Sequence, residues 1–182
     1  MTQNAPLKAV SVSILYHPVE DRLAWVVTAA DKSQLALTVT RRLTTRLVNG
    51  FAHLLERTSS AAQEAPPRAR GDIVMFEHQG ALAVAQAASS GSTSNAGTGA
   101  ATGPEATRLP SMLMDTVEVK ITPERFILIL KSGGKAVAQM EVTRGDLHRL
   151  LALLRRKCDE ADWRVVTETS WLDLDAGSMT LN

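Results

Sequence analysis

The sequence predicts an α+β protein in which one unit, antiparallel strands followed by a long helix, occurs twice. Short segments alternate apolar and polar residues with the period of two that marks a half-buried strand. Two longer segments place apolar residues along one side of a helix. A gapless shift of 103 residues aligns Asp21–Phe51 with Glu124–Leu154 and superimposes these patterns. We therefore expect an internal duplication.

Seven of the 31 aligned positions are identical. The identical pairs are Arg22/Arg125, Lys32/Lys135, Val39/Val142, Thr40/Thr143, Arg41/Arg144, Arg46/Arg149 and Leu47/Leu150. Three strands and one helix leave a sheet edge and a helix face uncovered, so one unit alone is a poor fold. We therefore expect the two copies to pair around a pseudo-twofold axis.

The first copy begins with three predicted strands, Ala9–Tyr16, Arg22–Thr28 and Gln34–Val39. The second of these is the most continuously apolar, which is typical of a central strand. His17–Asp21 and Ala30–Lys32 separate the strands and are rich in residues favoured in turns.

A helix is predicted next, with Thr40 as its N-cap. Its apolar stripe consists of Leu43, Leu47, Phe51, Leu54 and Leu55. Ser59–Gly71 then indicates a long loop. Ile73–Glu77 and Ala81–Gln86 are predicted to be two short strands joined by a hairpin at His78-Gln79-Gly80.

The second copy repeats this plan with predicted strands at Thr116–Ile121, Arg125–Leu130 and Lys135–Val142. Pro123-Glu124 and Ser132-Gly133-Gly134 are the expected turns. A second helix follows, with an apolar stripe of Leu147, Leu150, Leu151, Leu154 and Cys158.

Thr143 is the expected N-cap of the second helix, and Asp146 completes a variant of the capping box. Arg164–Leu174 is predicted as a last strand. The expected organisation is a first copy over 8–87, a flexible Gly/Ser/Thr/Ala linker over 88–110, a second copy over 111–175 and a tail over 176–182.

Composition excludes several classes of protein. The 20 basic and 19 acidic residues give a formal net charge of +1, so a nucleic-acid or membrane-surface role would depend on local clusters. Cys158 is the single cysteine, which excludes an intrachain disulfide and fits a reducing compartment. The sequence contains neither a secretory signal pattern nor a run of 18 apolar residues, so we expect a cytoplasmic protein without a membrane partner.

No catalytic or metal-binding motif is present in the sequence. His17, His53, His78 and His148 lack the spacing of a helical metal pair, and neither HExxH nor CxxC occurs. Cys158 belongs to the apolar stripe of the second helix rather than to a reactive site. We therefore predict no catalytic residue, no metal, no cofactor and no enzymatic activity.

The most unusual local feature is arginine at the start of both predicted helices. Arg41 and Arg42 open the first and Arg144 opens the second, although the helix dipole disfavours cations there. One interpretation is a site for an anion or a partner's carboxylate, built from arginine and free backbone N–H groups. The other is that the arginine stems cover the sheet edge and pair with Asp21 or Glu124.

Further basic side chains continue along the predicted exposed helix faces. Arg46 and His53 lie on the first helix, and Arg149 and Arg156 lie on the second with His148 nearby. These faces could bind an acidic partner or a phosphate backbone, or they could simply be solvated. The candidate binding residues are therefore Arg41, Arg42, Arg46, Arg144, Arg149 and Arg156.

Three functional classes remain open. A non-enzymatic interaction or assembly module, holding another protein or a second copy, is favoured by near-neutral charge and absent catalytic motifs. A single-stranded nucleic-acid binder is the alternative; the predicted layout resembles in outline the PUR and Whirly types, although no sequence motif of those families is present. An enzyme or ligand-binding protein with a site between the copies is the third. We predict the first.

Overall fold

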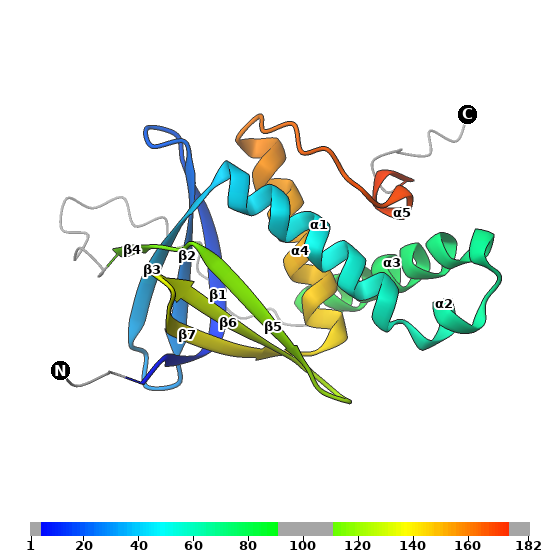
Figure 1. The fold of residues 1–182 in the computed structure, drawn as a ribbon, viewed down its shortest axis with the longest axis horizontal. Helices are drawn as coiled ribbons and strands as arrows, with labels where there is room; N and C mark the ends of the chain where they lie inside the picture. The colour runs from blue at the N-terminus through cyan, green and yellow to red at the C-terminus, as the bar shows by residue number, and fades with distance from the viewer. Residues whose placement is uncertain (1–4, 91–110, 175–182) are drawn as a thin grey trace.

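The structure of the protein is a computed structural model, which describes residues 5–90 and 111–174. The described residues form a mixed α+β fold, with a strongly curved seven-stranded sheet and helices gathered along one side of it (Figure 1). The strands are β1 (Leu7–His17), β2 (Arg22–Ala29), β3 (Gln34–Thr40), β4 (Ser111–Leu113), β5 (Thr116–Ile121), β6 (Phe126–Ser132) and β7 (Lys135–Val142).

The described helices fall into two long ones that contact the sheet and several that pack outside them. They are α1 (Arg41–Thr58), α2 (Ser60–Glu64), the 3-10 turn η1 (Pro67–Ala69), α3 (Arg70–Ser90), α4 (Arg144–Glu160) and α5 (Ser170–Leu174). α1 packs against α4, and α4 packs against α3.

The sheet has the order β4-β3-β2-β1-β7-β6-β5. β1–β2–β3 and β5–β6–β7 are antiparallel units, and β1 pairs in parallel with β7 to join them. β4 pairs in parallel with β3. Met114 and Asp115, which connect β4 to β5, donate their backbone N–H groups to the carbonyls of Thr38 on β3 and Lys131 on β6, each next to an outer strand. The sheet therefore curls until its two edges are bridged by one continuous segment.

The hydrophobic core lies between the inner face of the sheet and the helices α1 and α4. The strand β2 buries Leu23, Ala24, Trp25 and Val27, in agreement with its continuously apolar sequence, and β6 buries alternate residues. The largest of these are Trp25, Leu23, Leu128 and Leu130, which are fully buried. Each such side chain contributes about 1.5–3 kcal/mol by leaving water.

The predicted helix starts and one predicted turn are confirmed. Thr40 and Thr143 are N-caps, and the capping box of Thr143 with Asp146 is complete. Gly133 and Gly134 join β6 to β7 with φ of +58° and +73°. Positive φ at both positions is the backbone of a two-residue type I′ hairpin, which favours glycine.

The two strands predicted at Ile73–Glu77 and Ala81–Gln86 are wrong, because both segments belong to α3. The expected loop over Ser59–Gly71 is also wrong in part, since it contains α2 and η1. Short apolar runs do not distinguish a strand from a helix, and Gly80 between them is typical of a hairpin turn. The linker predicted from residue 88 begins with the end of α3, and residues 91–110 lie outside the described residues.

The last predicted strand, Arg164–Leu174, is wrong as well. Residues 164–169 have no regular secondary structure, and Ser170–Leu174 form α5. This segment instead runs along α1, where Asn49 Nδ2 donates to Val166 O at 3.0 Å and Oδ1 accepts from the Glu168 backbone N–H at 2.9 Å. The side chain of Asn49 thus makes the backbone hydrogen bonds that a neighbouring strand would otherwise make. The predicted tail lies outside the described residues.

Gly50, in the middle of α1, is expected to tolerate a larger residue. A Cβ atom there would meet no heavy atom within 4 Å. Because glycine has the greater conformational freedom when unfolded, we expect Gly50→Ala to raise the free energy of unfolding by about 0.5–1 kcal/mol in chemical denaturation. Gly134→Ala is the opposite control, since its φ of +73° strains any side chain and should lower stability.

Candidate interaction groove

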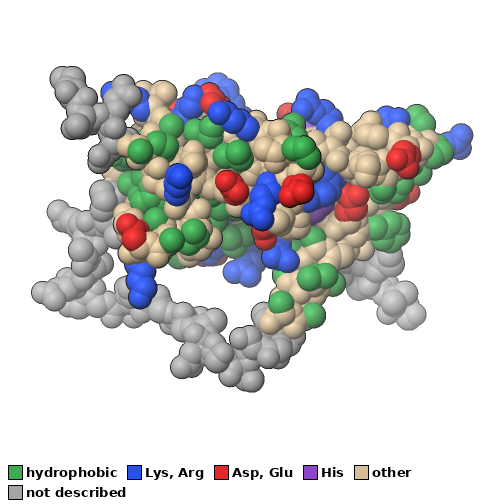
Figure 2. All heavy atoms as spheres, turned by 90° about the horizontal axis from the view of Figure 1, so that it is seen from below, with side chains coloured by type: hydrophobic (Ala, Val, Ile, Leu, Met, Phe, Trp, Pro, Cys, Tyr) green, Lys and Arg blue, Asp and Glu red, His purple; other side chains and the backbone are tan. Residues whose placement is uncertain are grey.

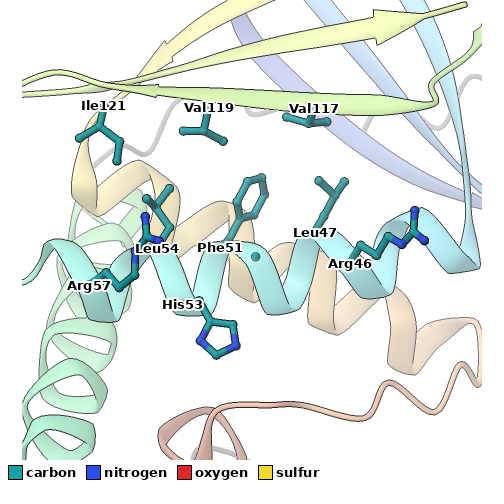
Figure 3. Close-up of a pocket in the computed structure, with 10 residues that line it drawn as sticks. Arg46, Leu47, Phe51, His53, Leu54, Arg57, Val117, Val119 and Ile121 are labelled. Atoms are coloured by element: carbon teal, nitrogen blue, oxygen red, sulfur yellow. The ribbon is translucent and has the colours of Figure 1, made fainter. Parts of the chain in front are cut away.

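A groove runs between helix α1 and the outer strand β5, with a volume of about 440 Å³ (Figure 3). Every residue that lines it comes from these two elements. The lining residues are Arg46, Leu47, Gly50, Phe51, His53, Leu54 and Arg57 on α1, with Val117, Val119 and Ile121 on β5.

The floor of the groove is apolar because the apolar face of β5 lies opposite the apolar stripe of α1. Alternate residues of β5 share one face, so Val117, Val119 and Ile121 all point toward α1 (Figure 3). On α1, Leu47, Phe51 and Leu54 recur at helical spacing and are at least 93% buried. Ile121, by contrast, is 53% exposed. Apolar surface therefore reaches solvent at one end of the groove.

The rim of the groove is basic. Arg46, His53 and Arg57 line it from α1, and none of the lining residues is acidic. A carboxylate reaches this rim from outside the groove at His53, where Glu168 Oε2 lies 3.2 Å from Nε2. A ligand that combines apolar and negatively charged groups would complement this lining.

Gly50 keeps the groove open, since a side chain at this position would project into the space between α1 and β5. β5 also has a free edge there, because among the described strands it pairs only with β6. Arg46 is one of the binding residues predicted from the sequence, whereas Gly50 and the β5 valines are not. The alignment of the two copies does distinguish Gly50, because the aligned position in the second copy is the large apolar residue Leu153.

The other predicted binding residues do not gather at this groove. Arg41 and Arg42 are exposed at the start of α1, and Arg156 is exposed on α4. Arg149 is half exposed, and its Nη1 lies 3.0 Å from Asp146 Oδ1 within the same helix. The structure therefore separates the candidates instead of assembling one cluster.

Arg144 is held in a part-buried network that the sequence did not predict. Its Nη2 donates to Glu77 Oε2 at 2.6 Å and to Leu55 O at 2.6 Å, and its Nη1 donates to Thr58 Oγ1 at 2.8 Å. Ser59 Oγ donates to the other Glu77 oxygen. The predicted partners Asp21 and Glu124 are thus wrong, because Arg144 pairs with Glu77 of α3.

Beside this network, two histidines meet in the interior. His78 Nδ1 and His148 Nδ1 are 3.1 Å apart, and the ring of His78 also makes an edge contact with Trp171 at 5.6 Å. Burial, followed by the fields of His78 and Arg144, lowers the pKa of His148 to about 3. The expected position of His148 near an exposed basic face is wrong, since it is 1% exposed.

A metal site requires a set of donor side chains, and a cysteine nucleophile requires a thiol that ionises readily. Clusters of three or more His, Cys, Asp or Glu suited to a metal are absent from the described residues. Cys158 is buried as predicted, and burial raises the pKa of its thiol to about 11. A thiol of that pKa is a poor nucleophile at neutral pH.

Aromatic side chains that could stack nucleic-acid bases are mostly inside the fold. Trp25, Trp163, Trp171 and Phe126 are at least 95% buried. Phe76 of α3 is 65% exposed, but it lies outside the groove. The face seen in Figure 2 intersperses basic and acidic side chains. Single-strand binders combine a basic channel with exposed aromatic side chains on which bases stack, and these two observations do not match that arrangement.

Comparison with protein-family models, with curated proteins and with solved structures gives no match. Within the described residues, none of the helices combines the length and apolar character needed to cross a bilayer.

Proposed function

We propose that the protein is a non-enzymatic interaction module that holds a segment of a partner protein in the groove between α1 and β5. The observation that carries the proposal is an apolar floor under a basic rim. An exposed apolar surface rimmed by polar groups is typical of an interaction site. A cytoplasmic location is part of the proposal and agrees with the single thiol of Cys158.

The free edge of β5 suggests how such a segment would lie. A strand at the edge of a sheet has backbone N–H and C=O groups without a neighbouring strand, and extended peptides commonly add to such edges. Here the same strand offers Val117, Val119 and Ile121 to the groove. An extended segment along β5 would gain backbone hydrogen bonds and apolar contacts together.

We further propose that the fold is an internal duplication with pseudo-twofold symmetry. The offset of 103 residues found in the sequence relates the two parallel strand pairings. Lys8 of β1 pairs with Gln139 of β7. Their counterparts under the offset, Ser111 of β4 and Ala36 of β3, pair with each other in the same way. The offset also converts the antiparallel pair Leu23–Val39 into Phe126–Val142. The β1–β2 and β5–β6 pairings differ by two residues under this offset, since Tyr16 pairs with Leu23 and Ile121 with Phe126. The register shared by the other pairings supports a common origin.

The groove can be tested with a displayed library of random peptides. We expect selection on the wild-type protein to enrich clones that fail to bind Gly50→Leu, because the leucine side chain would occupy the groove without meeting the core. Arg46→Glu/Arg57→Glu should also lose binding, since it reverses the charge of the rim.

Arg42→Glu is the matched control for this selection, because Arg42 is exposed on the same helix but does not line the groove. It should retain the enriched clones. Clones that bind all variants equally would place the interaction elsewhere and contradict the proposal.

A single-stranded nucleic acid is the second candidate partner. Arg42, Arg46, His53 and Arg57 recur at helical spacing along one side of α1, which favours it. Binding of a labelled oligonucleotide that falls steeply with salt and is lost in Arg42→Glu would select this function over the first.

A further inference from the structure

We propose that the segment held in the groove is acidic and inserts one large aromatic side chain between α1 and β5. This inference rests on the proposed function and on the proposed duplication. The charge of the rim and the side chain that fills the corresponding position in the other half of the fold support this chemistry.

The charge of the rim selects the acidic character. Two arginines and one histidine line the groove, and no lining residue is a carboxylate. Like charges brought together at an interface cost free energy, whereas opposite charges steer association and fix register. An acidic segment is therefore favoured over a basic one.

The aromatic anchor is inferred from Trp163. In the other half of the fold, α4 contacts β1. This arrangement corresponds to α1 and β5, which form the two sides of the groove. There the ring of Trp163 packs edge-on against Tyr16 of β1 at 6.0 Å, and its Nε1 donates to Asp21 Oδ1 at 2.7 Å. Trp163 is only 4% exposed. The chain thus covers its own strand with an indole ring.

In β5 the counterpart of Tyr16 is Ile121, because Tyr16 pairs with Leu23 and Ile121 pairs with Phe126, which aligns with Leu23. Ile121 lines the open groove and is 53% exposed. The offset of 103 residues places Ser60 at the position of Trp163, and Ser60 is exposed at the start of α2. The first half therefore has no indole of its own to cover β5. A partner's aromatic residue would supply it.

Gly50 leaves further open space along the groove. Its aligned residue, Leu153, is a half-buried side chain packed against the core. At Gly50 nothing stands within 4 Å of the Cβ position. The two halves thus differ in that Trp163 covers Tyr16 of β1 in one, while Phe51, Val119 and Ile121 line an open groove in the other.

The test uses three fluorescein-labelled peptides and anisotropy titration of the full chain. The first peptide carries a single Trp flanked by Asp and Glu, the second replaces this Trp by Ala, and the third replaces the acidic residues by Lys. We expect the first to bind at least about tenfold more tightly than either of the others. Gly50→Leu should weaken its binding to a similar degree, and Arg42→Glu should not.

The outcomes separate this inference from the proposed function. Equal binding of the Trp and Ala peptides overturns the aromatic anchor, and equal binding of the acidic and Lys peptides overturns the acidic character. Failure of all three, while library-selected peptides still depend on Gly50, overturns the inference and leaves the interaction module intact. Binding of the Trp peptide that Gly50→Leu does not change overturns the groove itself.

Discussion

Replacing Arg144 by alanine is expected to lower the free energy of unfolding by about 2–4 kcal/mol, a larger loss than we expect at any of the exposed arginines. The guanidinium makes two hydrogen bonds to Glu77 Oε2, at 2.6 and 3.1 Å, and further bonds to Thr58 and to the carbonyl of Leu55. Alanine would leave the Glu77 carboxylate part-buried without its cation. Urea denaturation at pH 7 measures the loss.

Arg156→Ala is the matched control, because Arg156 is exposed on the same helix. Its substitution should change stability by no more than about 0.5 kcal/mol. A double-mutant cycle with Glu77→Ala isolates the ion pair, and the two single losses should not add. Additive losses, or an Arg144→Ala protein as stable as Arg156→Ala, would show that the network contributes little.

This network also shows why part of the fold could be predicted and part could not. Strand alternation in β5 and β7 and the N-caps Thr40 and Thr143 are local patterns, and their predicted positions agree with the structure. The contact between Arg144 and Glu77 spans 67 residues. Predicting it required knowing that residues 70–90 form a helix beside α4.

The misassigned helix α3 has a physical explanation. Val74 and His78, four residues apart, are its fully buried positions, which is helical spacing. Gly80 nevertheless interrupts the apolar residues and imitates a turn. Its Cβ position is open, so the helix tolerates glycine at the usual cost without a clash. Tertiary contacts with α4 and α5 thus override a local signal for a hairpin.

The candidate groove was only partly visible in the sequence. Arg46 could be named because basic residues on a helix face are a local pattern. The space above Gly50 could not, because it depends on β5 approaching α1 from far along the chain. A comparison of the two repeats, Gly50 against Leu153, was the one available signal.

The protein should lose stability as the pH falls from 7 to 5, and His148 should account for about 2 kcal/mol of that loss. The pKa of His148 is lowered to about 3 in the folded protein, against about 6.5 when unfolded. Below pH 6.5 the unfolded chain therefore binds a proton that the folded chain does not. The stabilisation is complete above pH 6.5 and declines as the pH falls toward 3.

The surroundings of His148 explain why the folded state resists this proton. From α3 it faces His78 at 3.1 Å and Glu77, whose Oε2 is 4.0 Å from His148 Nε2; from its own helix it faces the cation of Arg144. Glu77 alone would favour a charged imidazole, but its Oε2 is already bonded to Arg144. Burial and the neighbouring cation therefore dominate, and the neutral ring is retained.

Urea denaturation at pH 7 and pH 5 tests this, and His148→Asn supplies the contrast because its amide can approximate the position of Nδ1 without titrating. We expect the loss between the two pH values to be about 2 kcal/mol smaller in His148→Asn than in the wild type. His17→Asn, which changes an exposed histidine, should retain the wild-type dependence on pH.

Asp31, Asp115 and Asp146 have pKa values lowered by their hydrogen bonds, so they stay ionised at pH 5 and do not contribute to the loss of stability between pH 7 and pH 5. An unchanged pH dependence in His148→Asn would mean that the buried histidine pair accepts a proton without cost, and that the field of Arg144 is neutralised by Glu77.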